Sequence, residues 1–386
     1  QRRWTLAVVT LDVETTTKHK GNVYDEDNKL CSIVIKVISE NLENLYSFSS
    51  PWDVGLINDL LNKSTKLIGF NIKFDLAWLR REFGFIPNNS VIIHDCQYAE
   101  FLFSKQTWRY PDLETSCSNY NLGHKIDVIK EKYWNKGIDT DQIPLEELLE
   151  YNRQDVELTY KLYKAQLEKF NEKPQLYKLF GVHMLDLPCL LEMEWNGLLY
   201  NKKKSLEQSE LLDKQVKDIE TKLNLLINFE LDWNSNDEKS AILYGGTVER
   251  VYKIPIGHYK SGPKTGLTRY KNETQVYTFN RQVEPLKGTE YKKGNVWSVD
   301  EPTLRSLKPN KQIKNIINLI LERAKLEKLN GTYLKGLPKK LEEKNWGTIL
   351  HPTYNQCVAV TGRVASSDPN GQNLVPLCKQ LIESRF

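Results

Sequence analysis

Short strand-like runs and longer helix-like runs of apolar residues follow one another through the first 170 residues. Residues 4–13 read as a buried strand that ends in acidic residues, and the alternation from Cys31 to Ile38 predicts a second strand that pairs with it as a hairpin or meander. The pattern then predicts a strand at 66–70, a helix from Ile72 to just before Gly84, a strand at 91–93, and helices at 98–103 and 144–170. This mixture predicts an α/β (α+β) domain over residues 1–172.

Longer helices predominate in the second part of the chain, residues 173–386. Helices are predicted at 181–197, 201–228 and 311–333. Apolar residues at near-helical spacing are expected to face inward on the last two helices: Leu206, Leu212, Val216, Ile219, Leu223, Leu226, Ile313, Ile316, Ile317, Ile320, Ala324 and Leu329. Between these helices, residues 245–298 are rich in Gly, Lys, Tyr and Thr. We therefore expect a mostly helical region with a β-hairpin-rich insertion at about 245–298.

The composition is that of an ordinary globular protein, with 40% hydrophobic and 27% charged residues among 386. No run of about 18 apolar residues is present, which argues against a membrane span. The six cysteines are scattered without a CxxC pair, so neither a zinc site nor a disulfide framework is expected. This cysteine usage favours a reducing cytoplasm.

Charge is distributed unevenly along the chain. Residues 1–170 carry 21 Lys+Arg against 25 Asp+Glu, a net charge of −4, and residues 245–340 carry 20 against 8, a net charge of +12. A solvated lysine-rich face is one explanation. The other is a protein that grips phosphates with its basic region and holds divalent cations in its acidic one.

Three short motifs place acidic and polar side chains on shared faces. Asp12 and Glu14 are two residues apart on a strand, so their side chains leave the same face. Asn71 and Asp75 are four apart on a predicted helix, and Tyr151 and Asp155 are four apart on a later one. Each motif occurs often by chance, whereas the combination supplies four carboxylates beside apolar stretches.

A cluster of four partly buried carboxylates needs counter-charge, because like charges in a poorly solvated site repel one another. Mg²⁺ and Mn²⁺ prefer carboxylate oxygens. Two such ions ~4 Å apart suit phosphodiester hydrolysis, since one activates water and the other stabilises the leaving oxygen. We therefore predict a two-Mg²⁺ (or Mn²⁺) site with Asp12, Glu14, Asp75 and Asp155 as ligands. Tyr151 is expected to orient the attacking water, and Asn71 to hold the substrate or support a ligand.

These motifs, TLDVETT, GFNIKFDLAW and EYNRQDVEL, resemble the DEDD exonuclease superfamily in its tyrosine-containing branch. The histidine-containing branch requires a His shortly before the last Asp, and the nearest one, His124, lies too early. The resemblance implies a ribonuclease H-like fold, 3′→5′ exonuclease activity and single-stranded DNA 3′ ends as substrate. It also implies that Asp95 opens a helix, while the neighbouring His94 is expected to be a packed residue. Aromatic residues that could stack on unpaired bases are Phe74, Trp78 and Phe101, with a core role favoured for Phe74 and Trp78.

The segment HPTYNQCVAVTGRVASSDPNGQNLVP (351–376) resembles the part of family A (Pol I-like) DNA polymerases that precedes their first catalytic aspartate motif. LEMEWNG (191–197) and RAKLEKLNGTY (323–333) resemble further segments of that family, and residues 245–298 look most like its phage members. The resemblance implies primer–template DNA as partner and thumb and palm segments in residues 173–386. It assigns Arg363 to the minor groove, and the remaining DNA contacts to Gln372, Asn373, Lys328, Asn330 and Thr332.

No segment resembles the palm motifs that hold the metals for nucleotidyl transfer, so this chain alone is not expected to extend a primer. We expect a C-terminal polymerase segment to supply them, on the same or a separate chain, in the cytoplasm of a host cell if the gene belongs to a phage. Two alternatives stay open. One is a stand-alone exonuclease acting on DNA or RNA, and the other is a non-catalytic DNA-binding subunit with an inactive nuclease fold.

Overall fold

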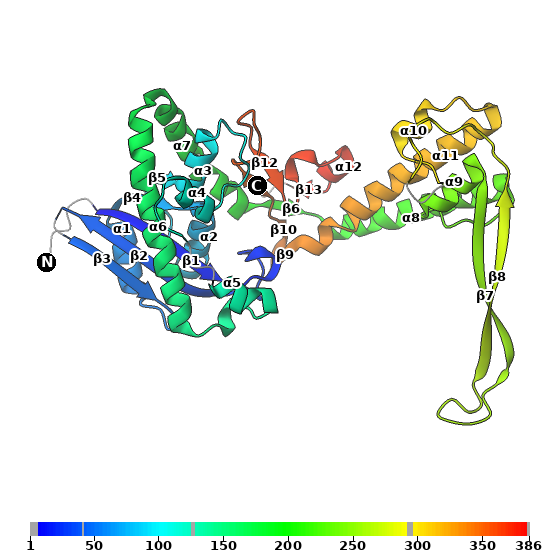
Figure 1. Ribbon diagram of the computed structural model, residues 1–386, viewed down its shortest axis with the longest axis horizontal. Helices are drawn as coiled ribbons and strands as arrows, with labels where there is room; N and C mark the ends of the chain where they lie inside the picture. The colour runs from blue at the N-terminus through cyan, green and yellow to red at the C-terminus, as the bar shows by residue number, and fades with distance from the viewer. Residues whose placement is uncertain (1–6, 41, 125–127, 292–295, 384–386) are drawn as a thin grey trace. The chain divides into compact units, whose positions relative to one another are not determined.

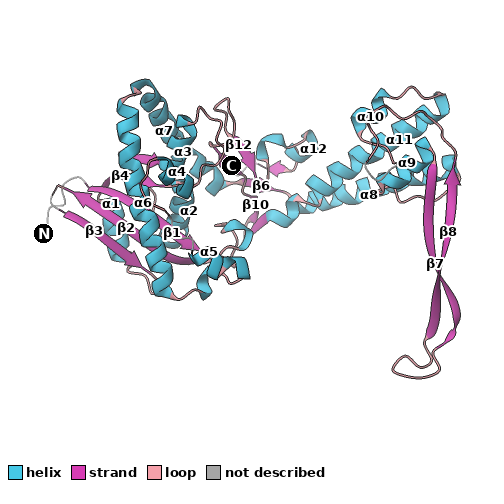
Figure 2. Ribbon diagram, in the orientation of Figure 1, coloured by secondary structure: helices cyan, strands magenta, loops and turns pink. Residues whose placement is uncertain are grey.

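The computed structural model describes residues 7–40, 42–124, 128–291 and 296–383. Contacts divide the chain into two compact units: unit 1, Gln1–Asn201 with Lys340–Phe386, and unit 2, Lys202–Lys339. Figure 2 shows that both contain helices and strands. The contacts place the boundaries of these units after residues 201 and 339. The boundary expected at residue 172, between the two predicted domains, stays a prediction.

The main sheet of unit 1 consists of β1 (Ala7–Thr15), β2 (Leu30–Ser39), β3 (Leu42–Phe48), β4 (Ser64–Gly69) and β5 (Ile92–Asp95). Its strand order is β3-β2-β1-β4-β5. The first three strands form an antiparallel meander, whereas β4 runs parallel to β1 and β5 runs parallel to β4. The predicted ribonuclease H-like α/β domain is confirmed.

Seven helices surround this sheet in the described part of unit 1 (Figure 1). They are α1 (Val54–Asn62), α2 (Ile72–Phe83), α3 (Cys96–Phe103), α4 (Leu113–Asn119), α5 (Val128–Lys132), α6 (Leu145–Asn171) and α7 (Pro174–Asn196). Short 3₁₀ turns lie at Lys18–Lys20, Trp134–Lys136 and Thr140–Gln142. Helix α7 begins earlier than the predicted residue 181, because Pro174 at its first turn suits a helix start.

The two faces of β1 contact different helices. Its odd-numbered residues, such as Leu11, are buried in one core with Trp78 of α2. On the even face, Val8 packs with Leu158 and Leu162 of α6. Because strand side chains alternate, every even position of β1, including its acidic ones, is directed to the α6 side.

Distant segments of unit 1 meet in a second sheet with the order β13-β6-β10-β9. Its strands are β6 (Leu198–Tyr200), β9 (Leu341–Lys344), β10 (Gly347–Leu350) and β13 (Ile382–Glu383). The same segment contains the pair β11 (Thr353–Asn355) and β12 (Ala365–Ser367), a 3₁₀ turn at Gly371–Asn373 and α12 (Pro376–Lys379). The described residues from 340 to 383 therefore belong to unit 1, although they follow unit 2 in the sequence.

Unit 2 is built on helices that carry a long hairpin. Its elements are α8 (Lys202–Ile227), α9 (Asn236–Tyr244), β7 (Gly246–His258), β8 (Thr268–Phe279), α10 (Glu301–Ser306), α11 (Lys311–Lys328), a π-helical turn (Leu329–Leu334) and a 3₁₀ turn (Leu337–Lys340) at its end. Leu223, Leu243 and Ile317 are among its core residues. Among the described residues of the predicted hairpin region, β7 and β8 form an antiparallel ribbon; residues 292–295 of that region lie outside the described part of the chain.

Three of the predicted inward-facing residues are exposed. The buried stripe of α8 runs through Ser205, Ser209, Leu212, Val216, Ile219 and Leu223, at steps of four and three residues. Leu206 lies beside this stripe, and Leu226 continues it in the last turn of α8; they are 44% and 41% exposed, so their assignment as inward-facing was wrong. The stripe includes two buried serines, Ser205 and Ser209. Ser205 is tolerated in the core because its Oγ donates a hydrogen bond to the Leu334 carbonyl, 3.1 Å away. Ala324 of α11 is likewise exposed. Its neighbour Arg323 is buried instead, and its Nε donates to Glu220 Oε1 of α8 at 2.7 Å.

Candidate active site

Three of the predicted metal ligands converge where β1 passes α6. Carboxylate oxygens of Asp12, Glu14 and Asp155 all lie within 4.8 Å of one another. The first two leave the even face of β1, and Asp155 is a buried residue of α6, the helix that covers this face. The strand and helix spacings predicted from the sequence therefore produce the cluster.

Asp75 lies beside this cluster, in the first turn of α2. It is 2% exposed, and its Oδ1 accepts a hydrogen bond from the Val13 backbone N–H at 2.9 Å. Burial and the charge of Asp12 raise the pKa of Asp75. The bond to Val13 fixes the carboxyl between the two acidic positions of β1. A bound cation would favour its ionised form.

Tyr151 lies one turn before Asp155 on α6 and is 7% exposed. Its ring packs edge-on against Trp134, with ring centroids 5.8 Å apart, in a cluster with Ile129 and Leu148. This packing holds the ring, so the position of its hydroxyl is set by the helix and its neighbours.

Asn71 and Asp95 join the turn before α2 to the start of α3. Asn71 has a left-handed backbone conformation (φ 60°) and an exposed side chain. Its backbone N–H donates to Asp95 Oδ1 at 3.0 Å, and the same oxygen accepts from the Gln97 N–H at 2.9 Å. Asp95 therefore opens α3, as expected. Burial raises the pKa of Asp95 to about 6.

A partly buried ion pair connects α2 with α7 and, through the backbone of Tyr354, with the C-terminal segment; the sequence analysis missed it. Lys73 Nζ contacts Glu194 of α7 and the carbonyl of Tyr354. Glu194 Oε1 in turn accepts from the Tyr354 N–H at 2.5 Å. Both charged residues lie in quoted motifs, GFNIKFDLAW and LEMEWNG, but their pairing joins residues 121 positions apart. The helix that carries Asp75 is thus tied to the segment 351–376.

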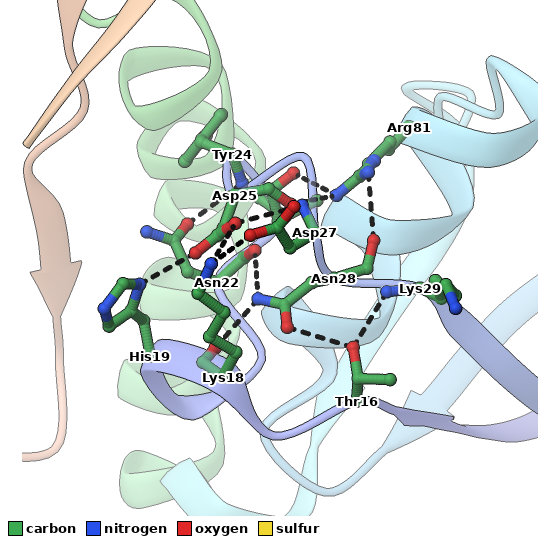
Figure 3. A network of polar contacts seen from close by, with 11 residues as sticks. Thr16, Lys18, His19, Asn22, Tyr24, Asp25, Asp27, Asn28, Lys29 and Arg81 are labelled. Atoms are coloured by element: carbon green, nitrogen blue, oxygen red, sulfur yellow. Dashed lines mark hydrogen bonds and ion pairs between the residues drawn. The ribbon is translucent and has the colours of Figure 1, made fainter. Parts of the chain in front are cut away.

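The loop that follows the acidic end of β1 is held by a polar network (Figure 3). Arg81 of α2 donates to the carbonyls of Val23, Asp25 and Asn28 over 2.8–3.1 Å. Asn28 Nδ2 donates to the carbonyls of Lys18 and Asn22. The network fixes the loop next to Glu14, and no local sequence pattern predicted it.

The backbone at Gly21 completes this loop. Trp78 Nε1 donates to its carbonyl at 3.1 Å. Gly21 has φ 67°, and a Cβ there would lie 2.6 Å from Thr15 Oγ1. Glycine is therefore required at this turn.

Two proposed base-stacking residues are core residues. Trp78 and Phe101 are both 0% exposed, so neither can stack on an unpaired base, and that assignment of Phe101 was wrong. Phe74 is only partly buried against the same core. His94 is a packed residue, as expected: it is 2% exposed, and its Nε2 lies 3.0 Å from Gln166 Oε1. Burial lowers the pKa of His94 to about 4.

The predicted DNA-contact residues are exposed, with one exception. In unit 1 these are Arg363, Gln372 and Asn373, and in unit 2 they are Lys328 and Thr332. Asn330 is 2% exposed, and its Nδ2 donates to Asp213 Oδ1 of α8 at 2.8 Å. Its assignment to phosphate was wrong, because the amide instead joins the π-helical turn to α8.

Family models match both parts of the chain. A model described as 3'-5' exonuclease matches residues 4–170, which contain the whole carboxylate cluster. A model described as DNA polymerase family A matches residues 271–384. The chain belongs to the family A DNA polymerases. It carries the 3′–5′ exonuclease domain of that family together with part of the polymerase domain.

Bacterial and phage family A relatives are similar over most of this chain. DNA polymerase I of Pseudomonas aeruginosa is 26% identical over 323 residues, which are 82% of this chain and 30% of the relative. The DNA polymerase of Bacillus phage SP01 is 24% identical over 339 residues, 81% of this chain and 34% of the relative. The chain therefore spans about a third of the length of these relatives.

The fold is also that of a solved family A structure. The POL domain of Pol1 from M. smegmatis, in complex with DNA primer-template and dNTP, aligns with a TM-score of 0.64 at 15% identity. The alignment covers 96% of this chain and 52% of that one. Among the residues that the structure describes, no helix is long and apolar enough to cross a membrane.

Proposed function

We propose that Asp12, Glu14, Asp75 and Asp155 form a two-metal 3′→5′ exonuclease site that removes mispaired 3′ ends from DNA primers. The observation that carries the proposal is the convergence of three carboxylates, with oxygens within 4.8 Å of one another, beside a fourth that is buried and hydrogen-bonded. An all-carboxylate donor set fits Mg²⁺ or Mn²⁺, which prefer oxygen ligands, and does not fit softer metals.

When bound, such cations supply an activated water and charge stabilisation for the leaving 3′-oxygen. The chain's own residues set the geometry. Asp12 and Glu14 present oxygens from a rigid central strand, and Asp155 does so from the helix across from it. The Tyr151 hydroxyl orients the attacking water, because its ring is fixed by Trp134. The exposed Asn71 amide holds the substrate near the site.

The rest of the chain serves to hold primer–template DNA. Arg363 contacts the minor groove, Gln372 and Asn373 contact the backbone, and Lys328 and Thr332 contact phosphates. All five side chains are exposed. Single-stranded 3′ ends are preferred as exonuclease substrate, since a paired end must first be melted. Primer extension requires a C-terminal polymerase segment with further carboxylates, and the protein works in the cytoplasm, that of a host cell if a phage encodes it.

The test is a gel assay on a 5′-labelled primer–template with Mg²⁺ and all four deoxynucleotides. We expect 3′ shortening by the chain and none by an Asp12→Ala/Glu14→Ala variant. Asp59→Asn, which changes a carboxylate on α1, is the matched control and should retain full activity. Absence of shortening by the unaltered protein would contradict the assignment and favour a non-catalytic DNA-binding subunit.

A parallel assay on DNA and RNA oligonucleotides separates the proofreading role from a stand-alone nuclease. The polymerase family match at residues 271–384 favours DNA. Faster degradation of RNA than of DNA would instead support a nuclease of the RNA-processing kind.

A further inference from the structure

The β7–β8 ribbon of unit 2 is anchored at its base and exposed along the rest of its length. Near the base, Val248 is 3% exposed, and Tyr277 packs against Phe229 with ring centroids 4.7 Å apart. Arg250 forms a 2.6 Å ion pair with Glu238 of α9. From Val251 to Tyr270 nearly every residue of the ribbon and its loop is exposed, and Figure 1 shows the ribbon extending from the helices of its unit.

This distal part is basic and lacks acidic residues. Residues 253–271 contain five Lys and Arg residues and no Asp or Glu: Lys253, Lys260, Lys264, Arg269 and Lys271. All five are exposed, and among the described residues no ion pair involves them. The base differs, since Arg250 is neutralised there by Glu238. Uncompensated cations concentrated on one projection attract a polyanion.

The cations lie on both faces of the ribbon. Lys253 is opposite Asn272 in the antiparallel register, and Lys271 is opposite Ile254. Opposite residues share a face, and successive residues alternate, so Lys253 and Lys271 are directed to opposite faces. A ribbon that only lay on a surface would need cations on one face. Cations on both faces suit insertion between two negatively charged walls.

We propose that the distal β7–β8 ribbon binds duplex DNA by entering a groove, with its cations contacting the phosphates of both strands. The major groove admits a two-stranded β-ribbon, and phosphates line both of its edges. Exposed Tyr259 and Tyr270 add hydroxyl donors for the backbone. Three glycines with positive φ, Gly257, Gly262 and Gly266, have no atom within 4 Å of an added Cβ, so the loop can approach DNA closely.

This contact is additional to those assigned to the polymerase family. Most of the distal ribbon, up to residue 270, lies between the two segments that the family models match, 4–170 and 271–384. It extends the proposed DNA binding of the chain and does not depend on the carboxylate site. An acidic protein is the competing partner. The distal ribbon exposes apolar side chains such as Ile254, Ile256 and Leu267 beside its cations. The presence of cations on both faces of the ribbon favours DNA, whose phosphates line both edges of a groove.

The experiment compares the full chain with a ribbon variant, Lys253→Ala/Lys260→Ala/Lys264→Ala/Lys271→Ala. A matched control removes four exposed lysines of unit 1: Lys136→Ala/Lys161→Ala/Lys173→Ala/Lys178→Ala. Binding to a labelled blunt-ended duplex is measured by fluorescence anisotropy over a series of salt concentrations, with a chelator present so that no DNA is cut. Circular dichroism melts check folding, and Mg²⁺-dependent shortening of a single-stranded oligonucleotide is measured separately.

We expect the ribbon variant to bind duplex DNA at least about tenfold more weakly at low salt. The slope of log K against the logarithm of the salt concentration should be shallower by about 2 to 4, because four phosphate-contacting cations are removed. The control should bind as the unaltered chain does, and both variants should melt normally and retain exonuclease activity. Unchanged duplex affinity in the ribbon variant would overturn the proposal, as would an equal loss in the control. The exonuclease readout is independent, so failure of that activity leaves this result interpretable.

Discussion

The carboxylate cluster of unit 1 and the distal ribbon of unit 2 both bear charges suited to nucleic acid chemistry, yet their surroundings are opposite. Asp75 is 2% exposed and hydrogen-bonded to the backbone of β1. Ile256, in the middle of the ribbon, is 47% exposed, and the lysines near it are exposed as well. Positioning a metal requires fixed oxygens, which only a packed core supplies. Attracting a phosphate backbone depends mainly on the number of cations and their reach.

The largest expected effect concerns the carboxylate cluster of unit 1. Asp155→Asn keeps the shape of the side chain and removes one anionic oxygen donor from a cluster spanning 4.8 Å. We expect exonuclease turnover on a single-stranded oligonucleotide to fall by about a thousandfold or more, equivalent to ~4 kcal/mol. Duplex binding in the presence of chelator should be unchanged. A loss of less than about tenfold would show that Asp155 is not a ligand.

The next effect is a pH dependence of stability that arises in the core of unit 1. Burial lowers the pKa of His94 to about 4, below the value of about 6.5 for an exposed histidine. The unfolded chain therefore takes up a proton that the folded chain excludes. The stabilisation is complete above about pH 6.5 and is lost as the pH falls toward 4, by up to about 3 kcal/mol.

Urea unfolding at a series of pH values measures this effect, with His94→Gln as the comparison. The variant has no titrating ring, so its stability should fall less steeply between pH 6.5 and 4. Identical slopes in both proteins would mean that folding leaves the pKa of His94 unchanged, which would contradict the shift caused by burial.

A smaller effect is expected where the loop after β1 is clamped. Arg81→Gln removes the guanidinium that donates to three backbone carbonyls and lies 4.8 Å from the Trp78 ring. We expect a loss of about 2 kcal/mol in the free energy of unfolding, measured in urea. Arg305→Gln, which breaks an exposed pair with Glu301 on α10, is the control and should cost less than about 0.5 kcal/mol. An equal loss of stability in both variants would show that the Arg81 hydrogen bonds to the loop do not stabilise the fold.

The smallest expected effect lies on the ribbon. Ile256→Ser changes an exposed side chain, so the free energy of unfolding should change by less than about 0.5 kcal/mol. The same change at the fully buried Ile57 should cost at least about 3 kcal/mol. Thermal melts compare the two variants. A destabilisation above about 1 kcal/mol at Ile256 would contradict the free, solvated state of the ribbon.

Local spacing explains what could be predicted from the sequence. Two residues on a strand and four on a helix define a face, so Asp12, Glu14, Tyr151 and Asp155 could be assigned before their contacts were known. Burial was harder to predict. Phe101 is a core residue and Asn330 a buried tie to Asp213, because an aromatic or amide side chain suits a core as well as a ligand. The Lys73–Glu194 pair could not be predicted, since it depends on which helices meet.

The second sheet of unit 1 has a consequence for synthesis on the ribosome. Strand β6 pairs with β10 and β13, and the Asn201 N–H donates to the Leu381 carbonyl. About 150 residues separate β6 from β10, which at ~5–20 residues per second take roughly 7–30 s to translate. All of unit 2 emerges during this interval. Unit 2 can therefore fold before β10 and β13 are synthesised, while the edges of β6 wait for partners that leave the ribosome later.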